Sequence, residues 1–359
     1  MKAAVLYSKG GAPQYVDFPE PVPQNDREVL VSVKAVALKH FDKSRAVGTH
    51  YSAETSGRGA TGAGAGGEGA GSQGAGGGGT GGQGASGREA KVIGGDGDCL
   101  LPDGSRVYAL GASGMMAEKA TVEKDRIVPL PAGLDDSIAA ALPNGVIGAA
   151  MALRFRAGIE PGDTVLINGA TGFTGRIAVQ IARHYGAGRI FATGRNPQSL
   201  QELLTLGADE IISIQQTDGD QQTDEEFIAA LRQIHRVSPI DVVIDYLWGH
   251  TAEMVLTSIK GDGSVSGRTR CVSVGAVTGD LIQLSAANLR STDLQLSGSG
   301  LGSWTRHQIG LLFSEILPEM FQLAADGKLK IGTTAVALAD IEKLWEVEVP
   351  DGRRLVVKI

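Results

Sequence analysis

Short apolar runs alternate with amphipathic stretches of helical spacing over residues 129–304. The first apolar run, TVLIN at 164–168, is followed by GRIAVQIARHYG at 175–186, which carries an apolar face at helical spacing. Six strands linked by crossover helices predict an α/β fold, a doubly wound parallel Rossmann sheet. The strands are expected at 164–168, 189–194, 210–214, 240–247, 270–276 and 294–300.

The flanking parts of the chain have a different pattern. Residues 29–38, VLVSVKAVAL, alternate with period two, and residues 1–128 as a whole indicate a β-rich module of short strands and turns. Residues 305–359 predict a helical stretch followed by strands that return to this module. The chain is therefore expected to have two domains, a β-rich one at 1–128 with 305–359 and an α/β one at 129–304.

A glycine-rich tract interrupts the β-rich module at about 55–90. Residues 57–87 are more than half glycine and contain no aromatic, large aliphatic or proline residue. Nothing in this tract can offset the backbone entropy lost on ordering, so we expect a flexible insertion without a core. Its spacing breaks too often for a collagen-like repeat, which also needs proline.

The segment between the first predicted strand and helix has the pattern of a dinucleotide-binding turn. In NGATGFTG, Gly169 allows a tight turn, Gly172 leaves room for a diphosphate, and Gly175 lets the helix pack closely on the strand. Unpaired N–H groups at the helix N-terminus would then face the anion. The expected cofactor-binding residues of this turn are Gly169, Ala170, Thr171, Gly172, Phe173, Thr174 and Gly175. A tight turn in any α/β domain is the alternative interpretation.

The end of the second predicted strand indicates which dinucleotide binds. NAD-selective enzymes place Asp or Glu there to accept from the ribose 2′-hydroxyl, whereas a cation favours the 2′-phosphate of NADP. The strand ends in Gly194, Arg195 and Asn196, and no carboxylate occurs between Phe191 and Leu200. A guanidinium can form paired hydrogen bonds with a phosphate, so NADPH is the expected cofactor. The alternative is that Arg195 is a solvated surface charge.

Composition narrows the class of protein further. The 359-residue chain has a net charge of −7 and no basic stripe, so no nucleic-acid partner is expected. It shows no signal-peptide pattern and no apolar run of about 20 residues, so we expect a cytoplasmic protein without a membrane partner. With only two cysteines, Cys99 and Cys271, no disulfide framework is expected, and both are interpreted as buried small hydrophobic residues or incidental thiols.

Several segments resemble the medium-chain dehydrogenase/reductase superfamily, and specifically its zinc-independent quinone oxidoreductase-like branch. The resemblance covers nearly the whole chain except about residues 55–90, and Asp42, Arg45 and Gly48 have the branch's D-x-x-R-x-x-G spacing. It implies a β-rich GroES-like domain beside the Rossmann domain. The segments that carry it are MKAAVL, FDKSRAVG, PDGSRVYALG, GIEPGDTVLINGATGFTG, GADEIIS, DVVIDYLWG and CVSVGAVTG.

The resemblance also implies where substrate and cofactor meet. The substrate pocket of this branch follows the VKAVAL strand, so Lys39 and Tyr51 are candidate catalytic donors, while Asp42 is expected to pair with Arg45 or Lys43 and shape the loop. Lys39 could instead be a solvated loop lysine.

Further cofactor contacts are expected along the edge of the parallel sheet. For Asp245, a cap on the following helix is an equally good interpretation. The resemblance implies that Asn144 lies near the nicotinamide. Asp245 and Tyr246 are expected near a ribose, and Val274, Gly275 and Ser299 at the later strand ends.

No zinc site is expected, because the chain has no His-Glu dipeptide and only two isolated cysteines. The expected activity is NADPH-dependent, metal-free hydride transfer to a quinone or an α,β-unsaturated carbonyl, whose charge delocalises onto a distant oxygen. Alternatives are a metal-free alcohol dehydrogenase, an enoyl-thioester reductase, or an NADPH-binding protein without activity. By analogy with the branch, the strand near 294–300 is expected to pair two copies into a homodimer.

Overall fold

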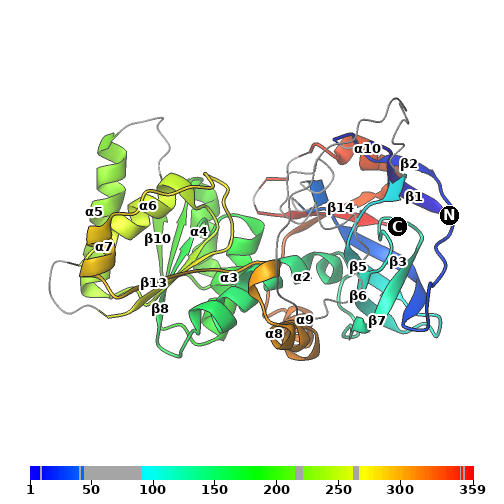
Figure 1. The fold of residues 1–359 in the computed structure, drawn as a ribbon, viewed down its shortest axis with the longest axis horizontal. Coiled ribbons are helices and arrows are strands. Elements are labelled where there is room, and N and C mark those ends of the chain that lie inside the picture. Colours follow the sequence, from blue (N-terminus) through cyan, green and yellow to red (C-terminus); the bar gives the residue numbers. More distant parts are fainter. Residues whose placement is uncertain are drawn as a thin grey trace, which may run out of the picture.

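The structure is a computed structural model that describes residues 1–8, 10–39, 42–43, 90–214, 221–261, 267–347, 349–350 and 352–359. The chain forms two halves joined through a central helix, and both termini lie in the β-rich half (Figure 1). Tyr51, Arg45, Gly48 and the glycine-rich tract lie outside the described residues.

One half is built on a six-stranded parallel sheet in the order β10-β9-β8-β11-β12-β13. The order reverses between β8 and β11, as in a doubly wound Rossmann sheet. This arrangement confirms the predicted fold class. The strands are β8 (Thr164–Asn168), β9 (Arg189–Gly194), β10 (Glu210–Ser213), β11 (Val242–Asp245), β12 (Thr269–Ser273) and β13 (Leu294–Gly298).

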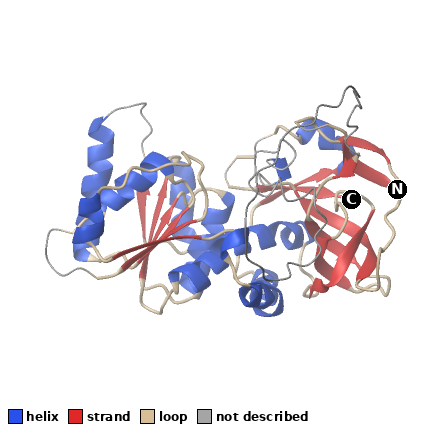
Figure 2. Ribbon diagram, in the orientation of Figure 1, coloured by secondary structure: helices blue, strands red, loops and turns tan. Residues whose placement is uncertain are grey.

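Helices cross over between these strands and cover both faces of the sheet (Figure 2). Their ends follow local chemistry: Asn196 accepts a hydrogen bond from Ser199 N at the start of α4, and Pro197 occupies the first turn, where its missing N–H costs nothing. The helices are α3 (Phe173–His184), α4 (Pro197–Thr205), α5 (Gln221–Val237), α6 (Gly249–Ser258) and α7 (Ala286–Ser291).

The other half is β-rich. A six-stranded sheet has the order β14-β15-β3-β5-β6-β7, and a three-stranded sheet the order β2-β1-β4. The C-terminal strand β15 pairs with β3, so the end of the chain does return to the N-terminal module. The strands are β1 (Lys2–Leu6), β2 (Gln14–Asp17), β3 (Glu28–Ala37), β4 (Lys91–Val92), β5 (Asp96–Leu100), β6 (Arg106–Gly111), β7 (Lys119–Pro129), β14 (Thr333–Ala337) and β15 (Arg354–Lys358).

Helix α2 (Asp136–Met151) connects the halves and continues as a π-helical segment, Ala152–Ala157. Asp135 caps it by accepting from Ser137 N and Ile138 N. Contrary to the sequence expectation, the stretch Asp136–Ala157 is long and apolar enough to cross a membrane. However, 67% of its apolar window is buried inside the protein, where α2 packs against α3, β3 and β5, so it serves as a core helix.

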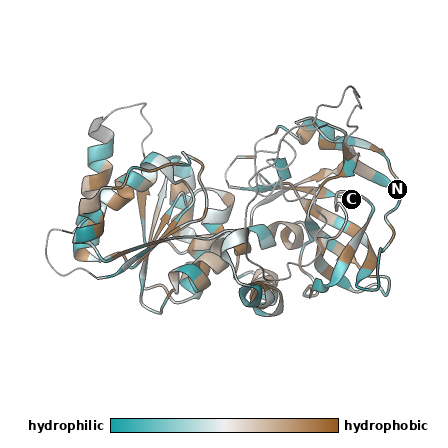
Figure 3. Cartoon of the chain, in the orientation of Figure 1, coloured by the Kyte–Doolittle hydropathy of each residue, from teal (hydrophilic) through white to brown (hydrophobic). Residues whose placement is uncertain are grey.

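The remaining helices precede the returning strands. They are α8 (Arg306–Leu311), a π-helical segment Leu312–Ile316, α9 (Leu317–Ala325) and the short α10 (Ile341–Leu344). Along these and other helices hydrophobic and hydrophilic residues form separate bands (Figure 3). The buried apolar residues of α2, α3, α4 and α9 belong to one core around α2, which includes Tyr108 and Val356 of the β-rich half and Val165 and Ile167 of the parallel sheet. The large buried apolar residues of α5 and α6 belong to a separate cluster.

Candidate functional site

The turn after β8, residues 169–175, is called the phosphate turn below, and it needs glycine at two positions for different reasons. Gly169 has φ +83°, and a Cβ there would lie 2.8 Å from Leu247 Cγ. A Cβ on Gly175 would lie 2.5 Å from the carbonyl oxygen of Gly169, which is backbone and cannot move aside. The first glycine therefore makes the tight turn and the second allows close packing of helix on turn, as the dinucleotide fingerprint requires.

Gly172 differs because a Cβ there would meet nothing closer than 3.9 Å. It is the N-cap of the 12-residue helix α3 and, having no side chain, leaves the helix start without a side-chain cap. The first amides of a helix have no partner within the helix and carry the positive end of its dipole. An open, uncapped helix start of this kind fits the diphosphate of a dinucleotide.

The other residues of the turn are held by packing. Ala170 is buried and donates its N–H to the carbonyl oxygen of Thr193. Thr171 packs at the end of β9, where a Cβ on Gly194 would come within 2.4 Å of Thr171 Cγ2. Thr174 lies against α2, since a Cβ on Gly148 would come within 2.7 Å of its Cγ2. The turn is thus fixed between β9 and α2.

A buried polar network joins the carboxyl ends of β8, β9 and β11. Thr193 Oγ1 donates to Asn168 Oδ1 (2.7 Å) and accepts the N–H of Gly169 (3.0 Å). Asn168 Nδ2 donates to Asp245 Oδ1 (2.9 Å). All three side chains are buried, with at most 1% exposed. Sequence reasoning did not identify Asn168 or Thr193; the available signal was a polar residue ending each apolar strand.

Asp245 ends β11 on the other side of the switch point. Its Oδ1 also accepts the N–H groups of Leu247 (2.9 Å) and Trp248 (3.1 Å), so it stabilises the turn leading into α6. Burial raises the pKa of Asp245, and these hydrogen bonds partly oppose that effect. Tyr246, expected beside a ribose, is 9% exposed and donates its hydroxyl to the carbonyl oxygen of Gly148 on α2.

The carboxyl edge of the parallel sheet carries three further residues that are expected to contact the cofactor: Val274, Gly275 and Ser299. The N–H groups of Val274 and Gly275 donate to Asp245 O, at 2.8 and 3.3 Å. A Cβ on Gly275 would lie 2.5 Å from Tyr246 O, so the strand ends approach closely. Ser299 follows β13, is 7% exposed, and accepts from Trp304 Nε1 (3.2 Å).

At the end of β9, Gly194 is buried while Arg195 is exposed to solvent. Asn196, expected to contact cofactor, uses its side-chain oxygen to cap α4. A second arginine lies near this corner: Arg176 Nε donates to Thr171 O (3.1 Å) and its Nη1 forms an ion pair with Glu202 (2.7 Å). The corner therefore combines an exposed arginine with one that supports the phosphate turn.

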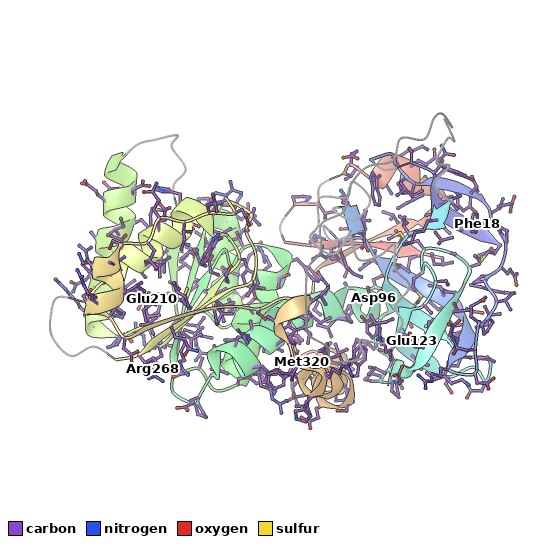
Figure 4. The ribbon with its side chains drawn as sticks, in the orientation of Figure 1. Phe18, Asp96, Glu123, Glu210, Arg268 and Met320 are labelled. Carbon is purple, nitrogen blue, oxygen red and sulfur yellow. The ribbon has the colours of Figure 1, made fainter. Side chains whose placement is uncertain are left out.

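Lys39, just after β3, is 4% exposed and is not a solvated loop lysine. Its ammonium forms an ion pair with Asp96 at the start of β5. The second oxygen of Asp96 accepts from Tyr108 Oη (2.8 Å). Asp96 lies on the part of the β-rich half that faces α2 (Figure 4). Burial alone lowers the pKa of Lys39, but Asp96 and Asp42 raise it above its ordinary value, so Lys39 remains an ammonium.

Asp42 is held against the backbone of Lys39. Its Oδ2 accepts the N–H of Lys39 (3.1 Å), and its own N–H donates to Lys39 O (3.0 Å). Burial raises the pKa of Asp42. Its expected partner Arg45 lies outside the described residues, as does the candidate donor Tyr51.

Lys39, Asp42 and Asp96 form a buried cluster of charges, called the Lys39 cluster below. Arg354 of β15 connects this cluster to the phosphate turn. Its guanidinium lies over the ring of Phe173, 4.4 Å from the centroid, and Nη2 donates to Asn144 Oδ1 (3.1 Å). Burial lowers the pKa of Arg354 to about 10, while Asp42 and Asp96 oppose the shift. Asn144, expected near the nicotinamide, is thereby tied to the first residue of α3. Sequence reasoning did not identify Arg354, because it lies 210 residues away from Asn144 in the chain.

Within the described ranges, no three or more His, Cys, Asp or Glu side chains form a group that could hold a metal ion. Cys99 and Cys271 are buried free thiols. Burial raises the pKa of Cys99 to about 12, which keeps this thiol protonated.

Comparisons with known proteins agree with this geometry. Residues 174–322 match the family model of zinc-binding dehydrogenases. The probable NADPH-dependent quinone reductase TdiC of Emericella nidulans is 26% identical over 385 residues, covering 96% of each chain.

Solved structures of quinone oxidoreductases share the whole fold. The enzyme from Thermus thermophilus, determined alone and with NADPH, is 25% identical with a TM-score of 0.70, and a mycobacterial quinone oxidoreductase is 19% identical with a TM-score of 0.76. Both alignments cover the full length of both chains. The phosphate turn, the sheet order and these full-length relatives all agree: the chain is similar throughout to the quinone oxidoreductase-like medium-chain dehydrogenase/reductases, and this similarity supports an oxidoreductase role.

Proposed function

We propose that the chain is an NADPH-dependent reductase of quinones or α,β-unsaturated carbonyl compounds that works without a bound metal. The observation that carries this proposal is the uncapped start of α3 beside a turn that only glycine can form at Gly169 and Gly175. The name of the E. nidulans relative and the NADPH complex of the T. thermophilus enzyme support the choice of cofactor and substrate class. The absence of a His-Glu dipeptide and of clustered cysteines in the sequence supports a metal-free site.

The residues that would hold NADPH are those of the phosphate turn and the strand ends. The amides at Gly172, Phe173 and Thr174 would bind the diphosphate, and Arg195 the 2′-phosphate. Val274, Gly275 and Ser299 would line the nicotinamide half, together with Asn144. Asp245 would support this crevice through its bond to the following turn, and Tyr246 through its bond to α2. When bound, NADPH supplies a hydride to the substrate.

Lys39 is the proposed catalytic residue. Hydride addition to a conjugated carbonyl places negative charge on the substrate oxygen, and a fixed cation in a buried setting stabilises such charge more than it would in water. Since the pKa of Lys39 is raised, its role is electrostatic stabilisation rather than donation of its own proton. Asp96 and Tyr108 are positioning residues that hold the ammonium in place. Tyr51 remains a second candidate donor.

The cofactor choice is tested by titrating the protein with NADPH and NADH. The parent is expected to bind NADPH at least tenfold more tightly, and Arg195→Ala to lose most of that difference, because a charge-assisted contact to the 2′-phosphate is removed. Arg126→Ala, at another exposed arginine on β7, is the matched control. Equal affinities for both nucleotides in the parent would refute the NADPH assignment.

The reaction is tested by product analysis with a quinone, an enone, a saturated ketone and an enoyl thioester. NADPH oxidation with quinone or enone is the expected result. Turnover of only the saturated ketone, or of only the thioester, would instead identify an alcohol dehydrogenase or an enoyl-thioester reductase. NADPH binding without turnover of any of them would identify a non-catalytic binding protein.

A homodimer is part of the same proposal. Strand β13 is the last strand of the parallel sheet, so its outer edge is available to pair with a second copy. Light scattering of the purified protein should give twice the chain mass of 37.1 kDa. A monomer at micromolar concentration would contradict this assignment.

A further inference from the structure

Trp248 has a backbone conformation that is rare for a residue with a side chain. Its φ is 58° and its ψ is −155°. Among the described residues, it is the only residue other than glycine with a positive φ. Such conformations are unfavourable for bulky residues and persist only where the surrounding structure imposes them, most often at functional sites.

The surrounding structure does impose this conformation. Trp248 N donates to Asp245 Oδ1 (3.1 Å), while its carbonyl oxygen accepts from Thr251 Oγ1 (2.9 Å) and Thr278 Oγ1 (2.7 Å). Its backbone also forms a parallel bridge with Gly279. Both backbone polar groups are therefore satisfied, and the turn is held from β11, from α6 and from the segment after β12.

The turn at residues 246–249 stands beside the phosphate turn. The side chain of Leu247 lies where a Cβ on Gly169 would point, 2.8 Å away. Asn168 joins the two turns a second time through its hydrogen bond to Asp245. The two turns follow β8 and β11, between which the strand order reverses, and dinucleotides bind at this switch point in doubly wound sheets.

The side chain of Trp248 in this turn is large, aromatic and partly exposed. Glycine at this position would form the same turn without an unfavourable backbone conformation. The hydrogen bonds that hold the turn do not need an indole, because they are made by the backbone of Trp248. The unfavourable conformation therefore points to a use for the side chain itself.

We propose that Trp248 is a dinucleotide-contacting residue whose indole forms the wall of the cofactor crevice opposite the phosphate turn. This inference rests on the proposed function, since it requires NADPH to bind at the switch point. An aromatic face offers a flat apolar surface to the rings of a nucleotide. Asp245 is the positioning residue that holds Trp248 in place.

The test compares Trp248→Asn with Trp248→Phe. Asparagine and phenylalanine both keep a Cβ in this backbone region, which glycine alone adopts freely, but asparagine has no ring whereas phenylalanine keeps an aromatic surface. NADPH affinity is measured by calorimetry, and the melting temperature of each variant is measured without ligand. We expect Trp248→Asn to raise the Kd for NADPH about tenfold with a melting temperature like that of Trp248→Phe. Trp248→Phe should stay within about threefold of the parent Kd.

Two results would overturn the proposal while the parent still binds NADPH. The first is a Kd of Trp248→Asn within twofold of the parent. The second is a loss of affinity shared by both variants and accompanied by a lower melting temperature, which would assign Trp248 a structural role. Trp248→Gly is a second variant without a ring, whose backbone suits the turn, should Trp248→Asn fold poorly.

Val237→Asn, at a residue 71% exposed at the end of α5, controls for replacing an exposed apolar side chain. If the parent itself does not bind NADPH, the proposed function fails rather than this inference alone.

Discussion

Four charged side chains of the β-rich half are each at most 8% exposed: those of Lys39, Asp42, Asp96 and Arg354. Burying a charge is unfavourable unless it is paired, and here two cations face two carboxylates. Paired charge of this kind contributes little net stability but strongly penalises removal of one partner. This burial is consistent with the catalytic role proposed for Lys39.

Substitutions of Lys39 and Asp96 are expected to have non-additive effects on the free energy of unfolding, because the two side chains form an ion pair. Lys39→Met leaves the Asp96 carboxylate buried without its cation and should lower the free energy of unfolding by about 3 kcal/mol. The double variant Lys39→Met with Asp96→Asn should recover more than half of that loss, while activity stays abolished. Urea unfolding measures the first effect and NADPH oxidation the second. A double variant no more stable than the single one would contradict the pairing.

The contribution of Asp98 to the free energy of unfolding is expected to fall as pH rises, whereas that of most carboxylates rises. Its side chain is fully buried, and burial raises its pKa to about 6 despite the ion pair with Arg106. The folded state therefore binds the proton more tightly than the unfolded state, and stability from this group is lost as pH rises from about 4 to 6. Asp98→Asn should gain up to about 3 kcal/mol relative to the parent between pH 4 and 7.

Urea unfolding at several pH values measures this difference. Asp103→Asn is the matched control, because the hydrogen bond from Ser105 N lowers the pKa of the exposed Asp103. Its carboxylate contributes stability that is fully present above the unfolded pKa, so the stability difference between this control and the parent should stay nearly constant between about pH 4 and 7. A parallel response of both variants would show that burial does not control the titration of Asp98.

At the scale of elements, two glycines of the phosphate turn are expected to have different roles. Gly175 should be needed for the fold, whereas Gly172 should be needed for cofactor binding. Gly172→Ala introduces a methyl group into open space at a φ of −72°, which alanine adopts freely. Gly175→Ala would place its methyl group 2.5 Å from a backbone oxygen. We expect the first variant to keep its melting temperature and lose NADPH affinity, and the second to lose both.

Calorimetry and thermal melting of the two variants test this separation. Gly310→Ala, in α8 with no atom within 4 Å of the added methyl group, is the control and should be stabilised by about 0.5–1 kcal/mol. Unchanged NADPH affinity in Gly172→Ala would show that the diphosphate does not approach this helix start.

At the scale of the whole molecule, one core spans both halves. Tyr108 and Val356 of the β-rich sheet belong to the same buried cluster as Val165 and Ile167 of the parallel sheet, and α2 lies between them. Arg354 adds a polar connection from β15 to Asn144 and Phe173. The halves should therefore unfold together, although only one of them carries the phosphate turn.

Differential scanning calorimetry measures this coupling. We expect a single transition, stabilised by about 2.7 kcal/mol when NADPH is present at 100 times its Kd, because ligand binds only the folded state. Two resolved transitions, with only one shifted by NADPH, would show that the shared core does not couple the halves.

Local pattern accounts for much of the fold that was predicted. The strand RIFATG matches β9 at Arg189–Gly194, and the strand TVLIN matches β8 at Thr164–Asn168. Apolar periodicity and glycine spacing are properties of neighbouring residues, so they can be found in one sequence. Partners distant in sequence could not be found in this way, including Asp96 for Lys39 and Arg354 for Asn144.

The sequence by itself determined the doubly wound sheet, its phosphate turn and the cation at the end of the second strand, because short-range sterics and periodicity control these features. Only the tertiary structure decided that Lys39 is a buried, paired ammonium, that Asn196 caps a helix, and that Trp248 has a positive φ. Burial, pairing and backbone strain arise where strands meet across the fold, and no local pattern encodes which strands meet.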